Sequence, residues 1–309
     1  MRKTLVSFLL EEASANPGLA VVTADLGYSV FEPFAEAHPS RFVNVGIAEA
    51  NMIGVAAGLA MCGKIPIAYS ITPFITARAM EQVRIDVCSH NLPVVLIGAG
   101  AGLCYGTLGP THHGTEDLAL MRAMPNMAVL APCDPHELSS LLRQAARLGS
   151  PAYIRIGRAT EPAVYEKGKE PAILLGKAVE VEKHGGEFAI IACGNAVFSS
   201  LQSLRSLEKE GKKGALYSMH TIKPLDCELI ASIGKKMPIF TVEEHSIIGG
   251  LGSAVAECLA DSGCASHALK RIALPDSFQK KVGTHDYLRK INGIDADSIA
   301  KRISESLKG

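Results

Sequence analysis

Six short apolar runs, with helical stretches between them, place the strongest constraint on how this chain can fold. The runs read "GLAVVTADLG", "RFVNVG", "KIPIAYSI", "LPVVLIGAG", "NMAVLAPCD" and "PAYIRIGR". Their apolar residues are continuous rather than alternating, which is typical of strands in a parallel sheet covered by helices on both faces. The pattern predicts an α/β domain over residues 1–160.

A change in composition follows this domain. The text from Ala159 to Gly176, "ATEPAVYEKGKEPAILLG", loses helical period and gathers Pro, Gly and charge, which predicts a linker over residues 161–175. Alternation of strands and helices then resumes with "EFAIIACG", "KGALYSMHT", "PIFTVEEH" and "HALKRIAL". We therefore expect two consecutive α/β domains with mostly parallel sheets, the second and smaller one over residues 176–309, as suits a chain of 309 residues.

The charge and cysteine content narrow the kinds of partner. Lys plus Arg equals Asp plus Glu at 31 each, with no charged block, so neither nucleic acid nor an anionic membrane is indicated. The eight cysteines form no CxxC pair, and nothing at the N-terminus reads as a signal peptide, so we expect reduced, mostly buried thiols in a cytoplasmic protein. No apolar run reaches about 18 residues, the length that predicts a membrane span.

Glycine-rich segments offer no phosphate-binding motif. "GAGAGLCYG" at residues 98–106 and "GGLGSAVAE" at residues 249–257 both break the GxGxxG spacing. The chain also has no GxxxxGK[ST] motif and no acidic motif suited to a magnesium diphosphate. We predict that it lacks its own phosphate cradle and its own metal ligands.

Glu49 is the one carboxylate in the small, apolar stretch "RFVNVGIAEANMIGVAAGLA" at residues 41–60. One interpretation is that it complements the dipole of a helix that starts there, which contributes about 0.3 to 1 kcal/mol. The other is that its surroundings exclude water, raise its pKa and equip it to exchange protons near neutral pH. These twenty residues do not separate the two.

Four segments together resemble the C-terminal half of transketolases and of the related deoxyxylulose-phosphate synthases. They are "GIAEANMIGVAAGLA", "YSITPFITARAMEQVR", "LGPTHHGTEDLALMRAMPNM" and "TVEEHSIIGGLGSAVAE", in this order. The resemblance extends over nearly the whole chain and is closest to the small, C-terminal subunit of a split, two-subunit transketolase.

The resemblance implies an enzyme of carbohydrate metabolism that transfers a two-carbon ketol unit from a ketose to an aldose. It implies thiamin diphosphate and magnesium, with the diphosphate and the metal held mainly by an N-terminal subunit. The active assembly would be a heterotetramer with two copies of each chain, and this chain alone would be inactive. The missing phosphate cradle agrees with that division.

At the cofactor end, the resemblance assigns Glu49 to the N1′ atom of the aminopyrimidine ring, where sharing a proton activates the cofactor. Phe74 matches the aromatic residue that stacks on this ring. Ile71 stands where many transketolases have a second aromatic residue. His112 matches the histidine near the reacting carbons, where a neutral imidazole hydrogen-bonds the substrate.

At the other end of the substrate, Arg2, Ser29 and Arg158 match residues that bind the sugar phosphate, and arginine suits such an anion. Two positions depart from the family. Gly100 replaces a histidine, which removes an anion contact and should open space, and Leu108 replaces an acid that contacts a substrate hydroxyl. We therefore expect an anionic sugar with an altered preference, such as a branched, deoxy or sulfonated one.

Several assignments stay open. His113 either supports the site from behind or is solvated, and His245 suits a contact between domains or subunits. Gly54 and Gly58 either pack on an internal strand or, as we favour, admit a helix of another subunit. Alternative functions are the β subunit of a 2-oxo acid dehydrogenase, a deoxyxylulose-phosphate-synthase-like enzyme, and a non-catalytic binding module.

Overall fold

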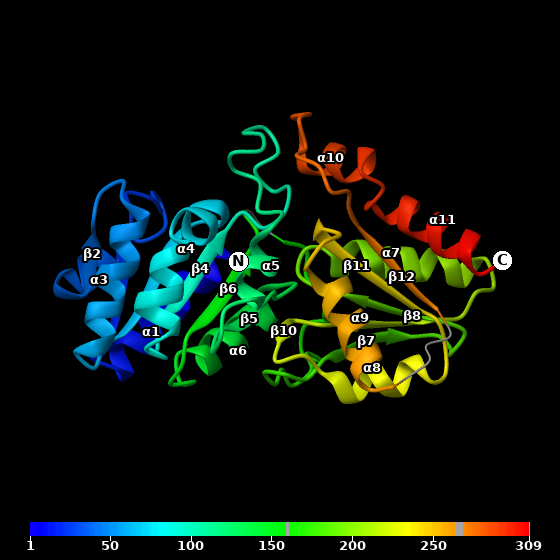
Figure 1. Ribbon diagram of the computed structural model, residues 1–309, viewed down its shortest axis with the longest axis horizontal. Helices are drawn as coiled ribbons and strands as arrows, with labels where there is room; N and C mark the ends of the chain where they lie inside the picture. Colours follow the sequence, from blue (N-terminus) through cyan, green and yellow to red (C-terminus); the bar gives the residue numbers. More distant parts are fainter. Residues whose placement is uncertain (159–160, 264–267, 309) are drawn as a thin grey trace.

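The computed structural model describes residues 1–158, 161–263 and 268–308. Two α/β domains follow one another along the long axis of the molecule (Figure 1). Residues 161–175, the predicted linker, contain neither helix nor strand. The predicted fold class, two α/β domains with mostly parallel sheets, is confirmed.

The first domain contains the elements from α1 to β6. In chain order they are α1 (Arg2–Ala15), β1 (Leu19–Thr23), α2 (Glu32–Ala37), the 3-10 turn η1 (Pro39–Arg41), β2 (Phe42–Asn44), α3 (Glu49–Met61), β3 (Ile65–Ile71), the π-helical turn η2 (Phe74–Arg78), α4 (Met80–Gln82), the π-helical turn η3 (Val83–Cys88), β4 (Val95–Ala99), α5 (Asp117–Arg122), β5 (Ala128–Leu130), α6 (Pro135–Ala145) and β6 (Ala152–Ile156).

The remaining elements lie in the second half of the chain, and all except β10 belong to the second domain. They are β7 (Val179–Lys183), β8 (Ala189–Ala192), α7 (Ala196–Lys209), β9 (Ala215–Ser218), β10 (Thr221–Lys223), α8 (Cys227–Gly234), β11 (Ile239–Ser246), α9 (Leu251–Asp261), β12 (Leu269–Leu274), α10 (His285–Ile291) and α11 (Ala296–Ser306).

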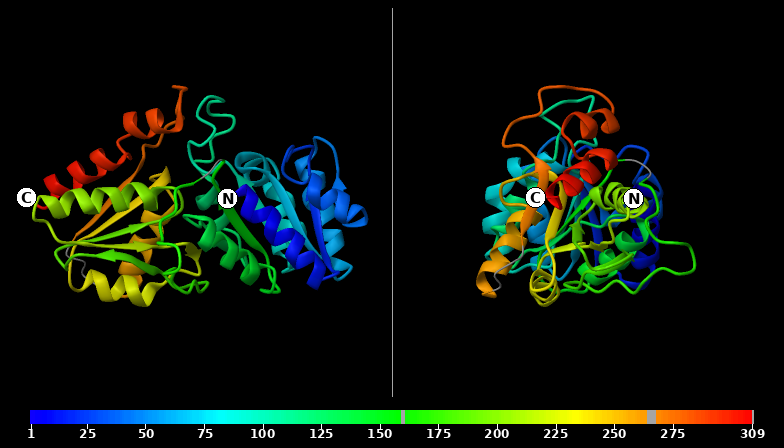
Figure 2. Two further views of the ribbon diagram at one scale, coloured as in Figure 1. Left: turned by 180° about the vertical axis from the view of Figure 1, so that it is seen from behind. Right: turned by 90° about the vertical axis from the view of Figure 1, so that its right-hand side faces the viewer.

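Each apolar run quoted above forms a strand, and the inner strands of the first sheet, such as β1, β4 and β6, are buried on both faces. Val21 of β1 packs in a cluster with α1 and α6, whereas its neighbour Val22 packs on the other face with α3. This two-sided burial explains why the strands read as continuous rather than alternating apolar segments. In the second domain, α7 and α11 cover one face of the sheet, and α8 and α9 cover the other (Figures 1 and 2).

The first sheet has the strand order β10-β5-β6-β4-β3-β1-β2, and the second has the order β12-β11-β8-β9-β7. All pairs are parallel except two, in which β10 pairs with β5 and β7 pairs with β9. Strand β10 comes from the second half of the chain, and Thr221 pairs with Leu130 of β5. One hydrophobic cluster also contains residues of both domains, so the two share part of a core.

Side-chain caps fix where several helices begin. Their oxygens accept hydrogen bonds from N–H groups of the first turn of α6, α8, α10 and α11, and the capping residues are Asp134, Asp226, Thr284 and Asp295. Helix α3 differs, because its N-cap is Ala48 and no side chain caps it. Its first residue, Glu49, is free to take part in other contacts.

Seven cysteines lie in the described part of the chain, and five of them are buried. This agrees with the prediction of mostly buried thiols; Cys264 lies outside the described residues. None of the helices described is both long and apolar enough to cross a lipid bilayer.

Candidate active site

Glu49 lies at the start of α3 with only 3% of its side chain exposed, and its carboxylate faces another segment. Arg78 Nη1 donates a hydrogen bond of 2.8 Å to its Oε2. This ion pair was not predicted from the sequence. The only sequence signal for it is that Arg78 follows Phe74 by four residues, so that both side chains can share one side of a helical turn.

Phe74 opens the π-helical turn that also carries Arg78. The guanidinium carbon of Arg78 lies 4.1 Å from the centroid of the Phe74 ring, a cation–π contact. The π-helical turn therefore presents an aromatic ring and a cation next to the buried carboxylate of Glu49. Ile71, which is buried, ends β3 three residues before Phe74.

His112 meets Phe74 from the loop between β4 and α5. Their ring centroids are 5.1 Å apart with an interplanar angle of 65°. Burial, and secondly the charge of Arg78, lowers the pKa of His112 below its ordinary value. A neutral imidazole is the form that the sequence predicted at this position.

Arg2, Ser29 and Arg158 line one cleft of about 740 Å³, although they come from α1, from the loop after β1 and from the segment just after β6. Among the described residues, neither arginine forms an ion pair with a carboxylate. Ser29 has a left-handed backbone (φ 58°), and its N–H donates to Glu32. The structure thus brings together the three residues that were matched to the anion-binding end.

Tyr105 connects this cleft to His112 and was not predicted as a site residue. Arg2 Nη2 donates a hydrogen bond of 2.7 Å to its hydroxyl, and the guanidinium carbon of Arg158 lies 5.2 Å from its ring centroid. On another side, the Tyr105 and His112 rings are 6.0 Å apart between centroids. No sequence pattern identified Tyr105, because its importance depends on three segments that meet only in the fold.

The expectation that Gly100 opens space beside the anion is wrong. Gly100 has φ +84°, and a Cβ atom there would overlap the ring of Tyr105. The phenol ring therefore fills the space that a side chain at position 100 would need. Leu108, by contrast, is 49% exposed and has no polar atom in its side chain to accept a hydrogen bond.

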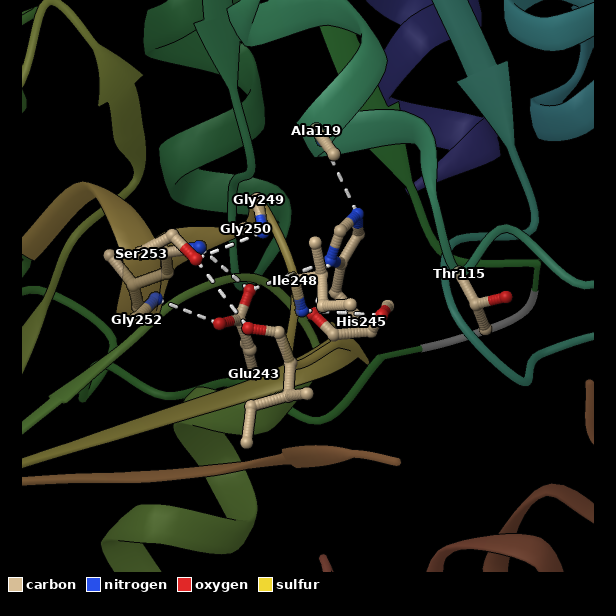
Figure 3. Close-up of polar contacts among 12 residues, drawn as sticks. Thr115, Ala119, Glu243, His245, Ile248, Gly249, Gly250, Gly252 and Ser253 are labelled. Atoms are coloured by element: carbon tan, nitrogen blue, oxygen red, sulfur yellow. Dashed lines mark hydrogen bonds and ion pairs between the residues drawn. The ribbon is translucent and has the colours of Figure 1, made fainter. Parts of the chain in front are cut away.

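The two histidines whose roles the sequence left open, His113 and His245, are both buried. His113 is 2% exposed, so the alternative that it is solvated is wrong. His245 lies between the domains: its Nδ1 donates to Ser246 O at 2.8 Å, and its Nε2 accepts from the Ala119 N–H of α5 at 3.4 Å (Figure 3). Beside it, Glu243 accepts hydrogen bonds from the first N–H groups of α9 (Figure 3).

Glu244 forms a second contact between the domains. Its Oε1 accepts hydrogen bonds of 2.6 Å from the Leu103 N–H and from His285, and its Oε2 accepts from Arg289 at 2.7 Å. Burial alone would raise the pKa of this carboxyl, but the charges of Arg289 and His285 hold it well below its usual range. Burial likewise opposes the charge of His285, yet Glu244 raises its pKa to about 10.

Within the described ranges, the one group of side chains with metal-ligand spacing is Cys104, Glu244 and His285. Both oxygens of Glu244 are already paired with cationic groups. A thiol and an ion-paired carboxylate do not suit magnesium, which prefers oxygen ligands and bound phosphates. This group is therefore not suited to hold the magnesium diphosphate that the resemblance implies.

Comparison with known proteins gives the family. The transketolase pyrimidine-binding domain model matches residues 1–162, and the transketolase C-terminal domain model matches residues 176–299. The chain belongs to the transketolase family.

Particular relatives are chains of similar length. A putative transketolase C-terminal section from Methanocaldococcus jannaschii is 40% identical over 309 residues, which is 100% of this chain and 96% of the relative. A 6-deoxy-6-sulfo-D-fructose transketolase subunit from Clostridium sp. (strain MSTE9) is 37% identical over 99% of this chain and 94% of the relative. A solved structure, described as a split gene transketolase, inactive β4 tetramer, matches with TM-score 0.88 and 34% identity over 99% of this chain and 97% of the other.

Proposed function

We propose that this chain is the C-terminal subunit of a thiamin diphosphate-dependent transketolase, which moves a two-carbon ketol unit from an anionic ketose to an aldose. The observation that carries the proposal is one continuous line of contacts. Its first part runs from the carboxylate of Glu49 through Arg78 to the ring of Phe74. Its second part runs from Phe74 through His112 and Tyr105 to the cleft that contains Arg2 and Arg158. A ketose placed along this line would have its reacting carbons near His112 and its anion among the arginines.

Each side chain has a defined task in this proposal. Glu49 holds a hydrogen bond to N1′ of the aminopyrimidine, Phe74 stacks on that ring, and Ile71 lines the pocket with a smaller, aliphatic side chain. His112, kept neutral by burial, hydrogen-bonds a substrate hydroxyl and moves a proton at that oxygen. When bound, thiamin diphosphate supplies the nucleophilic carbon. Arg2, Ser29 and Arg158 orient the terminal anion.

A partner chain would supply what this chain lacks. The diphosphate and its magnesium need oxygen ligands, and the described residues present no such cluster. The surface near Glu49 also has room for a partner: Ile47 is 81% exposed, and a Cβ atom at Gly58 would meet nothing within 4 Å. The description of a related β4 tetramer as inactive supports this division. We propose a heterotetramer with two copies of each subunit.

The test is to assay the purified chain alone and together with the large subunit. The chain alone should bind thiamin diphosphate weakly and show no ketol transfer. The pair should bind thiamin diphosphate tightly and catalyse ketol transfer. The subunit contact should bury more than about 2,000 Å². Substantial transketolase activity of the isolated chain would contradict the proposal.

A second assay on the pair uses pyruvate. Decarboxylation of pyruvate without ketol transfer would instead favour a 2-oxo acid dehydrogenase or a synthase of the deoxyxylulose-phosphate type. No turnover in either assay would favour a non-catalytic module.

A further inference from the structure

Tyr105 is the group on which the anion-binding cleft and His112 converge, and an inference about it rests on the proposed function. Its hydroxyl accepts from Arg2, its ring attracts Arg158, and the same ring lies beside His112. It is 7% exposed, so its ring is fixed by packing. A change at Tyr105 therefore reaches both ends of the substrate site.

The backbone around Tyr105 is built to hold the ring in place. Gly102 and Gly114 exchange two backbone hydrogen bonds of 2.8 Å, which close the base of the loop that carries Tyr105 and His112. Glu244 of the second domain holds the N–H of Leu103 in the same loop. In Figure 1 this loop, coloured teal, rises beside α10. Both rings therefore belong to one closed loop anchored on the second domain.

Gly100 and Tyr105 form a single structural arrangement. The positive φ of Gly100 and the position of the phenol ring leave no room for a Cβ atom at residue 100. The ring thus occupies the place from which a histidine at position 100 would reach the anion. The side chain that is absent at Gly100 is therefore replaced in space by the ring of Tyr105, five residues further along the chain.

The chemistry of the phenol suits a cationic cleft. Because the hydroxyl oxygen accepts from Arg2 Nη2, it keeps Arg2 pointing along one direction without neutralising it. The ring face does the same for Arg158, since a cation–π contact leaves the positive charge available.

We propose that Tyr105 is a positioning residue that sets the selectivity of this site for ketoses with an anionic terminus, phosphate or sulfonate. It orients Arg2 and Arg158 and fixes their distance from His112. The sugar is then selected by the length between its reacting carbons and its anion.

The first experiment measures steady-state kinetics of the reconstituted pair with the Tyr105→Phe variant, which removes only the hydroxyl. KM for fructose 6-phosphate should rise about tenfold, the factor that corresponds to about 1.4 kcal/mol. The kcat value should stay within about twofold, and KM for fructose, which has no anion, should not change. Equal effects on both sugars, or an effect on kcat alone, would overturn the proposal.

The matched control is Tyr217→Phe. Tyr217 is 8% exposed, and its hydroxyl donates to Glu180 at 3.0 Å in the second domain, away from the cleft. This variant also loses one hydrogen bond of a buried phenol, so it should lower thermal stability to a similar degree without a change in KM. A rise of KM in the control as well would show that the effect is general.

The second experiment does not depend on turnover and separates this inference from the proposed function. Binding of inorganic phosphate to the full chain is measured by calorimetry for the wild type, Arg158→Met and Tyr105→Phe. Loss of binding in Arg158→Met with about tenfold weaker binding in Tyr105→Phe supports the inference. Loss in Arg158→Met with unchanged binding in Tyr105→Phe overturns it and leaves the proposed anion site intact. Wild-type binding that is absent, or that Arg158→Met does not reduce, overturns both.

Discussion

Arg78 and Glu49 form an ion pair in which one partner is buried and the other is not: the Glu49 side chain is 3% exposed and that of Arg78 is 50% exposed. The same guanidinium lies over the ring of Phe74. One half-exposed cation thus contacts both of the residues that we assign to the pyrimidine ring. A carboxylate that only stabilised the start of a helix would not need this partner.

We expect Glu49→Gln to lower kcat of the reconstituted pair by roughly 10² to 10⁴, the range for residues that transfer protons. The amide keeps the shape of the side chain and an oxygen that accepts from Arg78, so the melting temperature should change little. Kinetics and thermal unfolding of the same preparation provide the check. Normal turnover together with a lower melting temperature would instead support the interpretation that Glu49 complements the helix dipole.

Replacement of Arg78 by Met should affect both stability and binding of the cofactor. Removal of one partner leaves a buried carboxylate without its counter-charge, which is costly even though solvent screens the exposed side of the pair. We expect a lower melting temperature and a kcat/KM reduced about 10- to 100-fold. The matched control is Arg84→Met, an exposed arginine six residues further on. If both variants behave alike, Arg78 has no special role.

The ion pair between Glu244 and His285 should make stability depend on pH. The pKa of His285 is raised from 6.5 to about 10 in the folded chain, so its contribution is complete below about pH 6.5 and is lost as the pH rises toward 10. The melting temperature of the wild type should therefore fall over this window, and that of His285→Gln should fall less. His90→Gln changes an exposed histidine and serves as the control. Identical profiles for the wild type and His285→Gln would contradict the assignment.

Leu108 should influence which sugar is preferred. If its apolar, half-exposed side chain faces a substrate carbon rather than a hydroxyl, Leu108→Asp should shift kcat/KM toward xylulose 5-phosphate by about tenfold, through a hydrogen bond to a hydroxyl. A panel of phosphorylated, branched, deoxy and sulfonated ketoses measures the ranking. Leu148→Asp changes a similarly exposed leucine in the loop after α6. An unchanged ranking, with xylulose 5-phosphate already the best donor, would show that position 108 does not set specificity.

The strands that sequence reasoning found and missed differ in a physical way. Buried parallel strands such as β1 and β3 were predicted because burial on both faces leaves a continuous apolar run. The two antiparallel additions, β7 and β10, were missed. Strand β10 has three residues, and its pairing with β5 depends on a partner about ninety residues away, which local periodicity does not report.

The residues of the candidate site also fall into those that the sequence identified and those that it did not. Glu49, Phe74 and His112 were identified from the resemblance to a family, and the structure brings them together. Arg78 and Tyr105 were missed because their roles arise from contacts between separate segments. The space assigned to Gly100 was wrong for the same reason, since Tyr105 fills it from a distance along the sequence.

Strand β10 has a consequence for how such a gene can be divided. Because β5 completes its hydrogen bonds with a strand from the second half, a chain cut in the linker would carry an unpaired edge beside β5. Such an edge invites pairing with other molecules, so the first half on its own should aggregate. Because of this strand, we expect residues 1–162 and 176–299 to fold correctly only as one polypeptide.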